Sequence, residues 1–111
     1  MKLKKVTIII PTRNEEKHIG NCLKSIFFQR YPRKLLQVIV IDNDSTDRTL
    51  EIAKKLGAQT VPTTLRNEEI KRSYAIKHLA KGEIIGMIDA DNYLPPQKDW
   101  LKKMIQPFED P

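Results

Sequence analysis

The chain has 111 residues, of which 40% are hydrophobic and 31% charged, and its formal net charge is +6. This composition predicts one modest soluble domain and excludes a disordered chain, and no apolar run is long enough to span a bilayer. The basic residues are scattered without interleaved aromatic residues, which argues against a nucleic-acid-binding face. The single cysteine, Cys22, excludes an internal disulfide and suits a reducing compartment. Together with the lack of a signal-peptide pattern, this predicts a cytoplasmic protein.

Segments of strand type alternate with segments of helical periodicity along the chain. Strands are expected at 6–10, 36–41, 58–61 and 83–88, and helices at 15–30, 45–56, 67–80 and 98–108. Pro11 should end the first strand and Asn14 should cap the first helix. The alternation predicts right-handed βαβ crossovers, and therefore an α/β fold with a Rossmann-like parallel sheet of about four strands and helices on both faces. The expected strand order is 3-2-1-4.

Apolar residues that recur at helical spacing predict which face of each helix is buried. They are Ile19, Cys22, Leu23, Ile26 and Phe27 in the first helix, Ile70, Ile76 and Leu79 in the third, and Trp100, Leu101, Met104, Ile105 and Phe108 in the last. The last helix offers more apolar surface than one face of a small sheet covers. This predicts self-association, with a compact monomer as the alternative.

Two carboxylates, Asp89 and Asp91, follow the fourth strand, which reads as a fully buried parallel strand. Ligands of open α/β sheets bind outside the carboxyl ends of the strands, where these acids should lie. They repel each other unless a cation lies between them, and oxygen ligands suit a hard divalent cation. The alternative is that an Asp here caps a turn. Asp42, at the end of the second strand, has the same two interpretations: a turn cap, or a partner for ribose or base.

The first strand-to-helix turn contains no glycine, and the chain has neither a dinucleotide-binding fingerprint nor a Walker loop. If a nucleotide binds, its phosphates are therefore held by a metal and not by the backbone amides of the first turn. A phosphoacceptor receiver domain is disfavoured, because Pro11 and Pro62 stand where that class of domain needs acids.

Three segments together carry a family resemblance: VTIIIPTRN at 6–14, VIVIDNDSTDRT at 38–49 and AKGEIIGMIDADN at 80–92. In order and spacing they resemble the family 2 glycosyltransferases, which are inverting enzymes with a nucleotide-diphospho-sugar transferase fold. The resemblance implies binding of a UDP- or GDP-sugar through Mn²⁺ or Mg²⁺. It also implies transfer of the sugar to an acceptor saccharide or a lipid-linked acceptor, with peripheral membrane contact as one option.

The resemblance implies a role for each matching residue. Asp91 takes the metal that bridges the diphosphate, while Asp89 contacts the ribose, a metal-bound water or the metal itself, and Asp42 contacts uracil or ribose. The loop that touches the base comprises Pro11, Thr12, Arg13, Asn14 and Glu15.

The sequence departs from the family pattern in two places. Asn43-Asp44 replaces the usual Asp-Gly, and Ser73-Tyr74 lies near the place of a frequent Asn. Because this Asn is missing, the sequence does not assign a residue of the third helix that would contact the phosphates. Such contacts could come instead from basic residues for which a solvated helix face is the expected state, namely Arg66, Lys71 and Arg72.

The largest departure is length, since catalytic domains of the family are about twice as long. We therefore expect residues 1–111 to be a single nucleotide-sugar-binding domain that is incomplete at its C-terminus. The general base is expected beyond Pro111, and no catalytic residue is assigned within the chain. The alternative function is a non-catalytic nucleotide-binding half-domain.

Overall fold

A computed structural model describes residues 3–64 and 67–109 of the chain. The strands are β1 (Val6–Thr12), β2 (Leu36–Asn43), β3 (Gln59–Thr63) and β4 (Ile84–Met87). The helices are α1 (Ile19–Phe27), α2 (Thr49–Lys55), α3 (Glu68–His78) and α4 (Trp100–Glu109), and one 3₁₀ turn, η1 (Arg33–Leu35), precedes β2. The predicted alternation of strands and helices is thereby confirmed.

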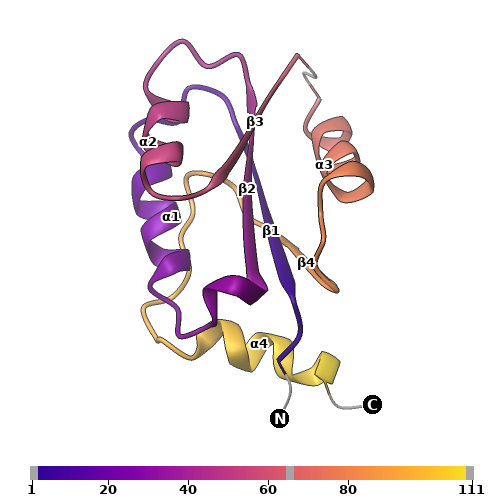
Figure 1. The fold of residues 1–111 in the computed structure, drawn as a ribbon. Helices are drawn as coiled ribbons and strands as arrows, with labels where there is room; N and C mark the ends of the chain where they lie inside the picture. Colours follow the sequence, from indigo (N-terminus) through magenta and orange to yellow (C-terminus); the bar gives the residue numbers. More distant parts are fainter. Residues whose placement is uncertain (1–2, 65–66, 110–111) are drawn as a thin grey trace.

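The sheet is parallel throughout and has the order β3-β2-β1-β4, as predicted (Figure 1). β1 pairs with β2 along its whole length, from Val6 opposite Leu36 to Thr12 opposite Asp42. β4 pairs only with the first part of β1, from Val6 to Ile9. The chain reverses its direction of progress across the sheet between β1 and β4, so the carboxyl ends of these strands form the crevice that a ligand of this architecture uses.

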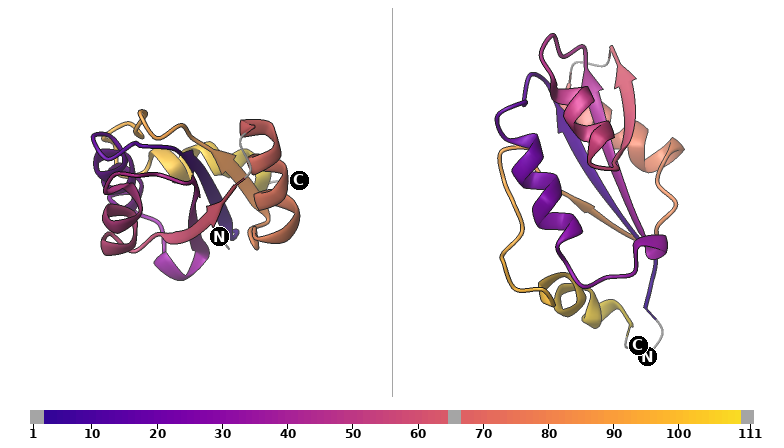
Figure 2. Two further views of the ribbon diagram at one scale, coloured as in Figure 1. Left: turned by 90° about the horizontal axis from the view of Figure 1, so that it is seen from above. Right: turned by 60° about the vertical axis from the view of Figure 1, so that its left-hand side comes forward.

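The sheet lies between two helical layers, with α1, α2 and α4 packed on one face and α3 on the other (Figures 1 and 2). The side chains of β1 alternate between these layers, as the period of two in a strand requires. Ile8 and Ile10 belong to the larger hydrophobic cluster, whereas Ile9 packs with Ile41 and Ala75 under α3.

Pro11 does not end the first strand, because β1 continues to Thr12 and Pro11 pairs with Ile41 of β2. The carbonyl of Ile9 accepts a hydrogen bond from the amide of Ile88, at 3.1 Å, so the backbone N–H and C=O groups of Ile9 face β4. Backbone groups of alternate residues in a strand point to the same side. Pro11 has the same orientation, but β4 ends at Met87 and leaves no partner strand at that height. The missing N–H of proline therefore costs no ladder hydrogen bond.

The first helix is shorter than predicted, because turns occupy 16–18 and α1 begins at Ile19. Asn14 does not cap it: the N-cap is His18, without a side-chain hydrogen bond, and Asn14 lies four residues earlier. The predicted buried stripe of this helix is confirmed. Four of its five residues are fully buried, namely Ile19, Cys22, Leu23 and Ile26, and Phe27 is half-buried against the same cluster.

Of the three predicted core contacts of the third helix, Leu79 packs against the sheet as predicted, but Ile70 and Ile76 do not. Ile70 and Ile76 are 51% and 41% exposed, whereas Ala75 is fully buried and Lys71 nearly so. Lys71, Ala75 and Leu79 repeat at a spacing of four, and the small side chain of Ala75 lets α3 approach Ile9 and Ile41 closely. The prediction followed the larger side chains, whereas the packing is decided by the smallest one.

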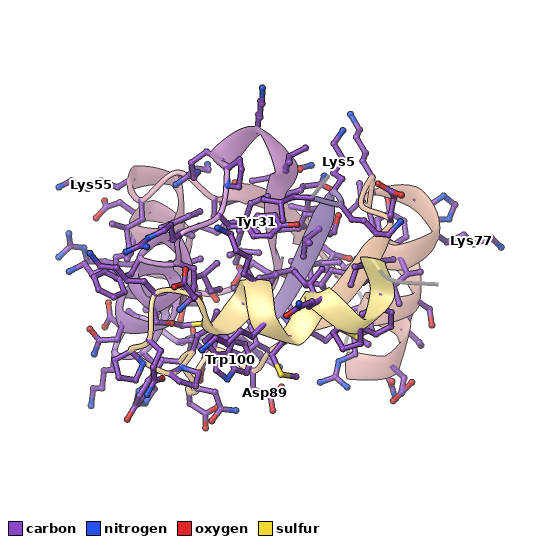
Figure 3. All side chains as sticks on the ribbon, turned by 90° about the horizontal axis from the view of Figure 1, so that it is seen from below. Lys5, Tyr31, Lys55, Lys77, Asp89 and Trp100 are labelled. Atoms are coloured by element: carbon purple, nitrogen blue, oxygen red, sulfur yellow. The ribbon has the colours of Figure 1, made fainter. Side chains whose placement is uncertain are left out.

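The fourth strand is an edge strand in which three residues are half-buried and Met87 is exposed, so the prediction of a fully buried strand is wrong. Helix α4 crosses the sheet near the amino ends of the strands, at the bottom of Figure 1, with Trp100 at its start (Figure 3). Leu101 and Ile105 are buried as predicted, but Met104 and Phe108 are 54% and 65% exposed. These two side chains and β4 line an apolar hollow of about 240 Å³. Self-association through this face stays a prediction.

The basic residues are distributed around the molecule, as the sequence indicates. Lys55 and Lys77, for example, extend from opposite sides of it (Figure 3). Among the described residues, no helix combines the length and the apolar character that crossing a membrane requires.

Candidate functional site

The loop after β1 is fastened to the loop after β2 by its backbone amides. The amides of three consecutive residues, Asn14, Glu15 and Glu16, donate hydrogen bonds of 2.8, 2.8 and 3.2 Å. Their acceptors are Ser45 Oγ and Asp47 Oδ2 of the second loop and Thr49 Oγ1 at the start of α2. Amides that already have acceptors cannot cradle a phosphate. The geometry thus agrees with the absence of a Gly-rich sequence here.

The second loop returns hydrogen bonds to the first. The amide of Thr46 donates to Asn14 Oδ1 at 2.8 Å, and the amide of Arg48 donates to Glu16 Oε2 at 3.2 Å. Asn14 and Asp44 have φ values of 51° and 49°, a left-handed conformation that Asn and Asp tolerate better than most residues. Asp44 therefore adopts the conformation for which a glycine is usual, and this accounts for the departure from Asp-Gly.

Asp42 is fully buried at the end of β2 and holds both loops. Its Oδ1 accepts hydrogen bonds from the hydroxyls of Thr12, at 2.6 Å, and Ser45, at 2.5 Å, and its Oδ2 accepts from the amide of Ser45 at 2.9 Å. The turn-capping role is present in the structure. Contact with ribose or base stays a prediction.

The residues predicted to contact the base differ in accessibility. Pro11 and Thr12 are buried, Glu15 is half-buried, and Arg13 and Asn14 are exposed. Arg13 and Asn14 are therefore the accessible members of this set, and the side-chain oxygen of Asn14 already accepts a hydrogen bond from the amide of Thr46.

Asp89 and Asp91 lie in the turn that follows β4, and both are exposed. Ala90 between them is 3% exposed and packs into the core, and the amide of Asn92 closes the turn on the carbonyl of Asp89 at 3.0 Å. This alternation directs the two acids away from the core. Asp89 Oδ1 accepts a hydrogen bond from Arg72 Nη2 at 3.2 Å, whereas Asp91 has no hydrogen bond or ion pair with a described residue.

Cys22 is buried in α1 beside this turn, with its Sγ 4.0 Å from the carbonyl oxygen of Asp89. Burial, together with the nearby carboxylates of Asp91 and Glu15, raises the pKa of its thiol to about 12. The thiol stays protonated at neutral pH, which fits the predicted packing role.

Two basic residues of α3 are not part of a solvated face, contrary to the prediction. Lys71 is 1% exposed, and the Arg72 side chain is 31% exposed and reaches Asp89. Lys71 lies four residues and Arg72 three residues before the small, buried Ala75, and this helical spacing indicates that both side chains lie on the inner side of α3. Arg66, the third candidate, lies outside the described residues.

The donor set fits a divalent cation only in part. Within the described residues, no group of three or more His, Cys, Asp or Glu side chains could hold a metal ion. A cation such as Mg²⁺ is often held by one or two carboxylates, with water and substrate phosphates completing its shell. Asp89 and Asp91 fit a cation that arrives with a phosphorylated ligand better than a cation enclosed by protein ligands.

Comparison with known proteins assigns the family. Residues 7–111 match the family model described as Glycosyl transferase family 2. The chain belongs to this family. The resemblance predicted from the three sequence segments is thereby confirmed, and the sheet order agrees with the fold of nucleotide-sugar transferases.

Three relatives illustrate the match. A transferase of Methanococcus voltae, named dolichyl N-acetyl-alpha-D-glucosaminyl phosphate 3-beta-D-2,3-diacetamido-2,3-dideoxy-beta-D-glucuronosyltransferase, is 36% identical over 94% of this chain and 34% of its own length. The mannosyltransferase PcManGT of Pyrobaculum calidifontis, solved with GDP-Man and Mn²⁺, has a TM-score of 0.87 and 34% identity over 97% of this chain and 33% of its own. TarS 1-349 of Staphylococcus aureus, solved with UDP-GlcNAc, has a TM-score of 0.82 and 31% identity over 96% and 31%. The chain thus spans about a third of each of these proteins.

Proposed function

We propose that this chain binds the nucleotide-diphosphate sugar of a glycosyltransferase, a UDP- or GDP-sugar, with a divalent cation at Asp91 and Asp89. The observation that carries the proposal is the pair of exposed carboxylates at the crevice, one of which, Asp91, has no hydrogen bond or ion pair with a described residue. Support comes from the complexes of relatives with GDP-Man and Mn²⁺ and with UDP-GlcNAc.

The nucleoside is proposed to lie over the fastened loops at the ends of β1 and β2. Arg13 and Asn14 present exposed side chains there, and Pro11, Thr12 and Glu15 form the loop beneath them. Asp42 is proposed to face the ribose or base, with its carboxylate fixed by Thr12 and Ser45. A loop whose hydrogen bonds are made before the ligand arrives loses little conformational entropy on binding.

The reaction proposed is transfer of the sugar to a hydroxyl of a saccharide or a lipid-linked acceptor, at the cytoplasmic surface of a membrane. When bound, the cation would offset the negative charge that develops on the leaving diphosphate. Asp91 and Asp89 would hold the cation, and the hydrogen-bonded loops after β1 and β2 would hold the nucleoside in a fixed position. The general base is proposed to lie beyond Pro111.

The second candidate is a nucleotide-binding module that transfers nothing. It is favoured by one observation, the share of about a third that the chain covers of its relatives. A sugar-transfer assay on this chain, alone and joined to downstream sequence where that exists, separates the two. Turnover by residues 1–111 alone would contradict a base beyond Pro111, and Glu15, Asp44 and Asp47 would then be the acids to test.

Calorimetric titration of UDP and of GDP tests the binding proposal directly. We expect binding with Mn²⁺ present and at least about a tenfold loss of affinity with excess chelator, because two carboxylates alone repel a diphosphate. Equal affinity in both conditions would contradict a metal role for Asp89 and Asp91. Failure of both nucleotides to bind in either condition would contradict the proposed function itself.

A further inference from the structure

The two acids of the turn after β4 differ in their partners. Asp91 is free of hydrogen bonds and ion pairs with described residues, whereas Asp89 is held by Arg72, with Nη2 and Oδ1 3.2 Å apart. Arg72 comes from α3, which is fixed on the sheet through Ala75 and Ile9. The guanidinium thus approaches Asp89 from a helix that is packed on the sheet, and a cation that binds this carboxylate competes with it for the negative charge.

The ion pair leaves one donor of Arg72 without an acceptor. Its Nε is buried and has no hydrogen-bond partner among the described residues. A buried donor without a partner is unfavourable, so the pair with Asp89 does not satisfy the guanidinium fully. The planar guanidinium fork matches phosphate oxygens as well as it matches a carboxylate. A diphosphate in the crevice would therefore offer Arg72 an alternative anion.

We propose that Arg72 is a positioning residue that occupies Asp89 until a nucleoside diphosphate arrives, and that it thereby makes cation binding depend on the nucleotide. The inference rests on the proposed function. Without nucleotide, the cation competes with a fixed positive charge for Asp89. With nucleotide, the guanidinium turns to the diphosphate and releases the carboxylate. Because coupling between two ligands is reciprocal, the cation then strengthens nucleotide binding by the same factor.

The experiment measures Mn²⁺ affinity by electron paramagnetic resonance of the free ion, without nucleotide and with saturating UDP or GDP. Without nucleotide, Arg72→Gln should bind Mn²⁺ about two- to fivefold more tightly than the natural chain, as expected from the loss of a partly exposed ion pair. The gain in Mn²⁺ affinity that the nucleotide brings should shrink in this variant. In an Asp89→Asn background, Arg72→Gln should no longer change the Mn²⁺ affinity, which a double-mutant cycle measures.

Arg48→Gln is the matched control. Arg48 also forms an ion pair, with Glu51 at 2.7 Å, and its replacement changes the net charge equally without touching Asp89. We expect its Mn²⁺ affinity to stay that of the natural chain. Arg72→Lys keeps the charge and loses the fork, so it should lie between the natural chain and Arg72→Gln, and it serves as the test if the glutamine variant does not fold.

The outcomes separate this inference from the proposed function. Unchanged or weaker Mn²⁺ binding by Arg72→Gln without nucleotide, while the nucleotide still promotes Mn²⁺ binding to the natural chain, would overturn the role of Arg72 alone. An equal gain in Arg48→Gln would also overturn it, since the effect would then come from net charge. No Mn²⁺ binding by any variant, with or without nucleotide, would overturn the proposed function together with the inference.

Discussion

The two halves of the candidate site both lie at the carboxyl ends of the strands. They differ in how many of their polar side chains have hydrogen-bond partners within the protein. At the ends of β1 and β2, the buried Asp42 accepts three hydrogen bonds and the two loops exchange donors and acceptors. At the end of β4, both acids are exposed and Asp91 has no such partner among the described residues. The half at β1 and β2 is therefore held by internal hydrogen bonds without a ligand. The half at β4 has exposed carboxylates whose charge a bound cation could neutralise.

The difference follows from the position of each strand in the sheet. β1 and β2 are the two central strands and have helices on both faces, and Thr12 and Asp42 at their carboxyl ends are buried, so the polar groups of these two residues need internal partners. β4 is an edge strand that pairs with four residues of β1. Water reaches its end and can solvate an unpaired carboxylate. Strand position thus decides which acid is structural and which is available.

The largest expected effect tests that difference in burial. Ile39 of β2 is fully buried, and Ile39→Ala should lower the free energy of unfolding by about 2–5 kcal/mol. Ile88, which is half-buried after the edge strand, should cost clearly less when replaced by Ala, because part of its surface already meets water. Urea denaturation of both variants measures the two values. Equal losses would show that the β4 side is packed as firmly as the centre.

Two glycines, Gly82 before β4 and Gly86 within it, test the same contrast between close packing and open surface. A Cβ on Gly82 would lie 2.5 Å from the backbone nitrogen of Thr7 in β1, whereas a Cβ on Gly86 would meet no atom within 4 Å. Gly82→Ala must shift backbone and should cost about 1–3 kcal/mol, the range for an overpacked site. Gly86→Ala is the control and should be neutral or slightly stabilising. Similar losses in the two variants, measured by urea denaturation, would contradict the close approach.

The sequence was sufficient for the strand order, the buried stripe of α1 and the family, because each rests on a pattern that many residues share. It was not sufficient where a single small residue sets the orientation of a helix, or where the place at which an edge strand ends decides which backbone groups are paired. Ala75 set the orientation of α3, which a search for large apolar side chains could not detect. The role of Pro11 depended on where a strand distant in sequence ends. The partner of Asp89 was found only once α3 was placed on the sheet.

Asp91→Asn should affect binding and not folding, in contrast to the core variants. The side chain is exposed and has no hydrogen bond with a described residue, so the melting temperature should stay close to that of the natural chain. Affinity for UDP or GDP with Mn²⁺ should fall by about tenfold or more, since hydrogen bonds and contacts to a charged group contribute roughly this much. A melting temperature lowered as far as in Ile88→Ala would make Asp91 structural instead.

The smallest effect concerns the fastened loops and depends on pH. Burial tends to raise the pKa of the Asp47 carboxyl, but hydrogen bonds from the Thr49 hydroxyl, the Thr49 amide and the Glu16 amide lower it further than burial raises it. Because the pKa in the folded chain lies below the ordinary value of 3.8, the carboxylate stabilises the fold above that pH. This contribution is lost as the pH falls through the lowered value.

Asp47→Asn should therefore lower the melting temperature by about 2–4 °C at pH 7, a small change for a domain of this size, and the deficit should shrink below about pH 4. Asp44→Asn is the matched control. It removes the same charge from the same loop, Asn tolerates the left-handed conformation at this position, and the Asp44 carboxylate accepts no hydrogen bond from a described residue. Thermal unfolding followed by circular dichroism between pH 3 and 7 compares the two variants. A deficit in Asp47→Asn that persists unchanged at pH 3 would mean that the carboxylate charge does not fasten the loops, and the contrast with the solvated acids after β4 would then rest on Asp42 alone.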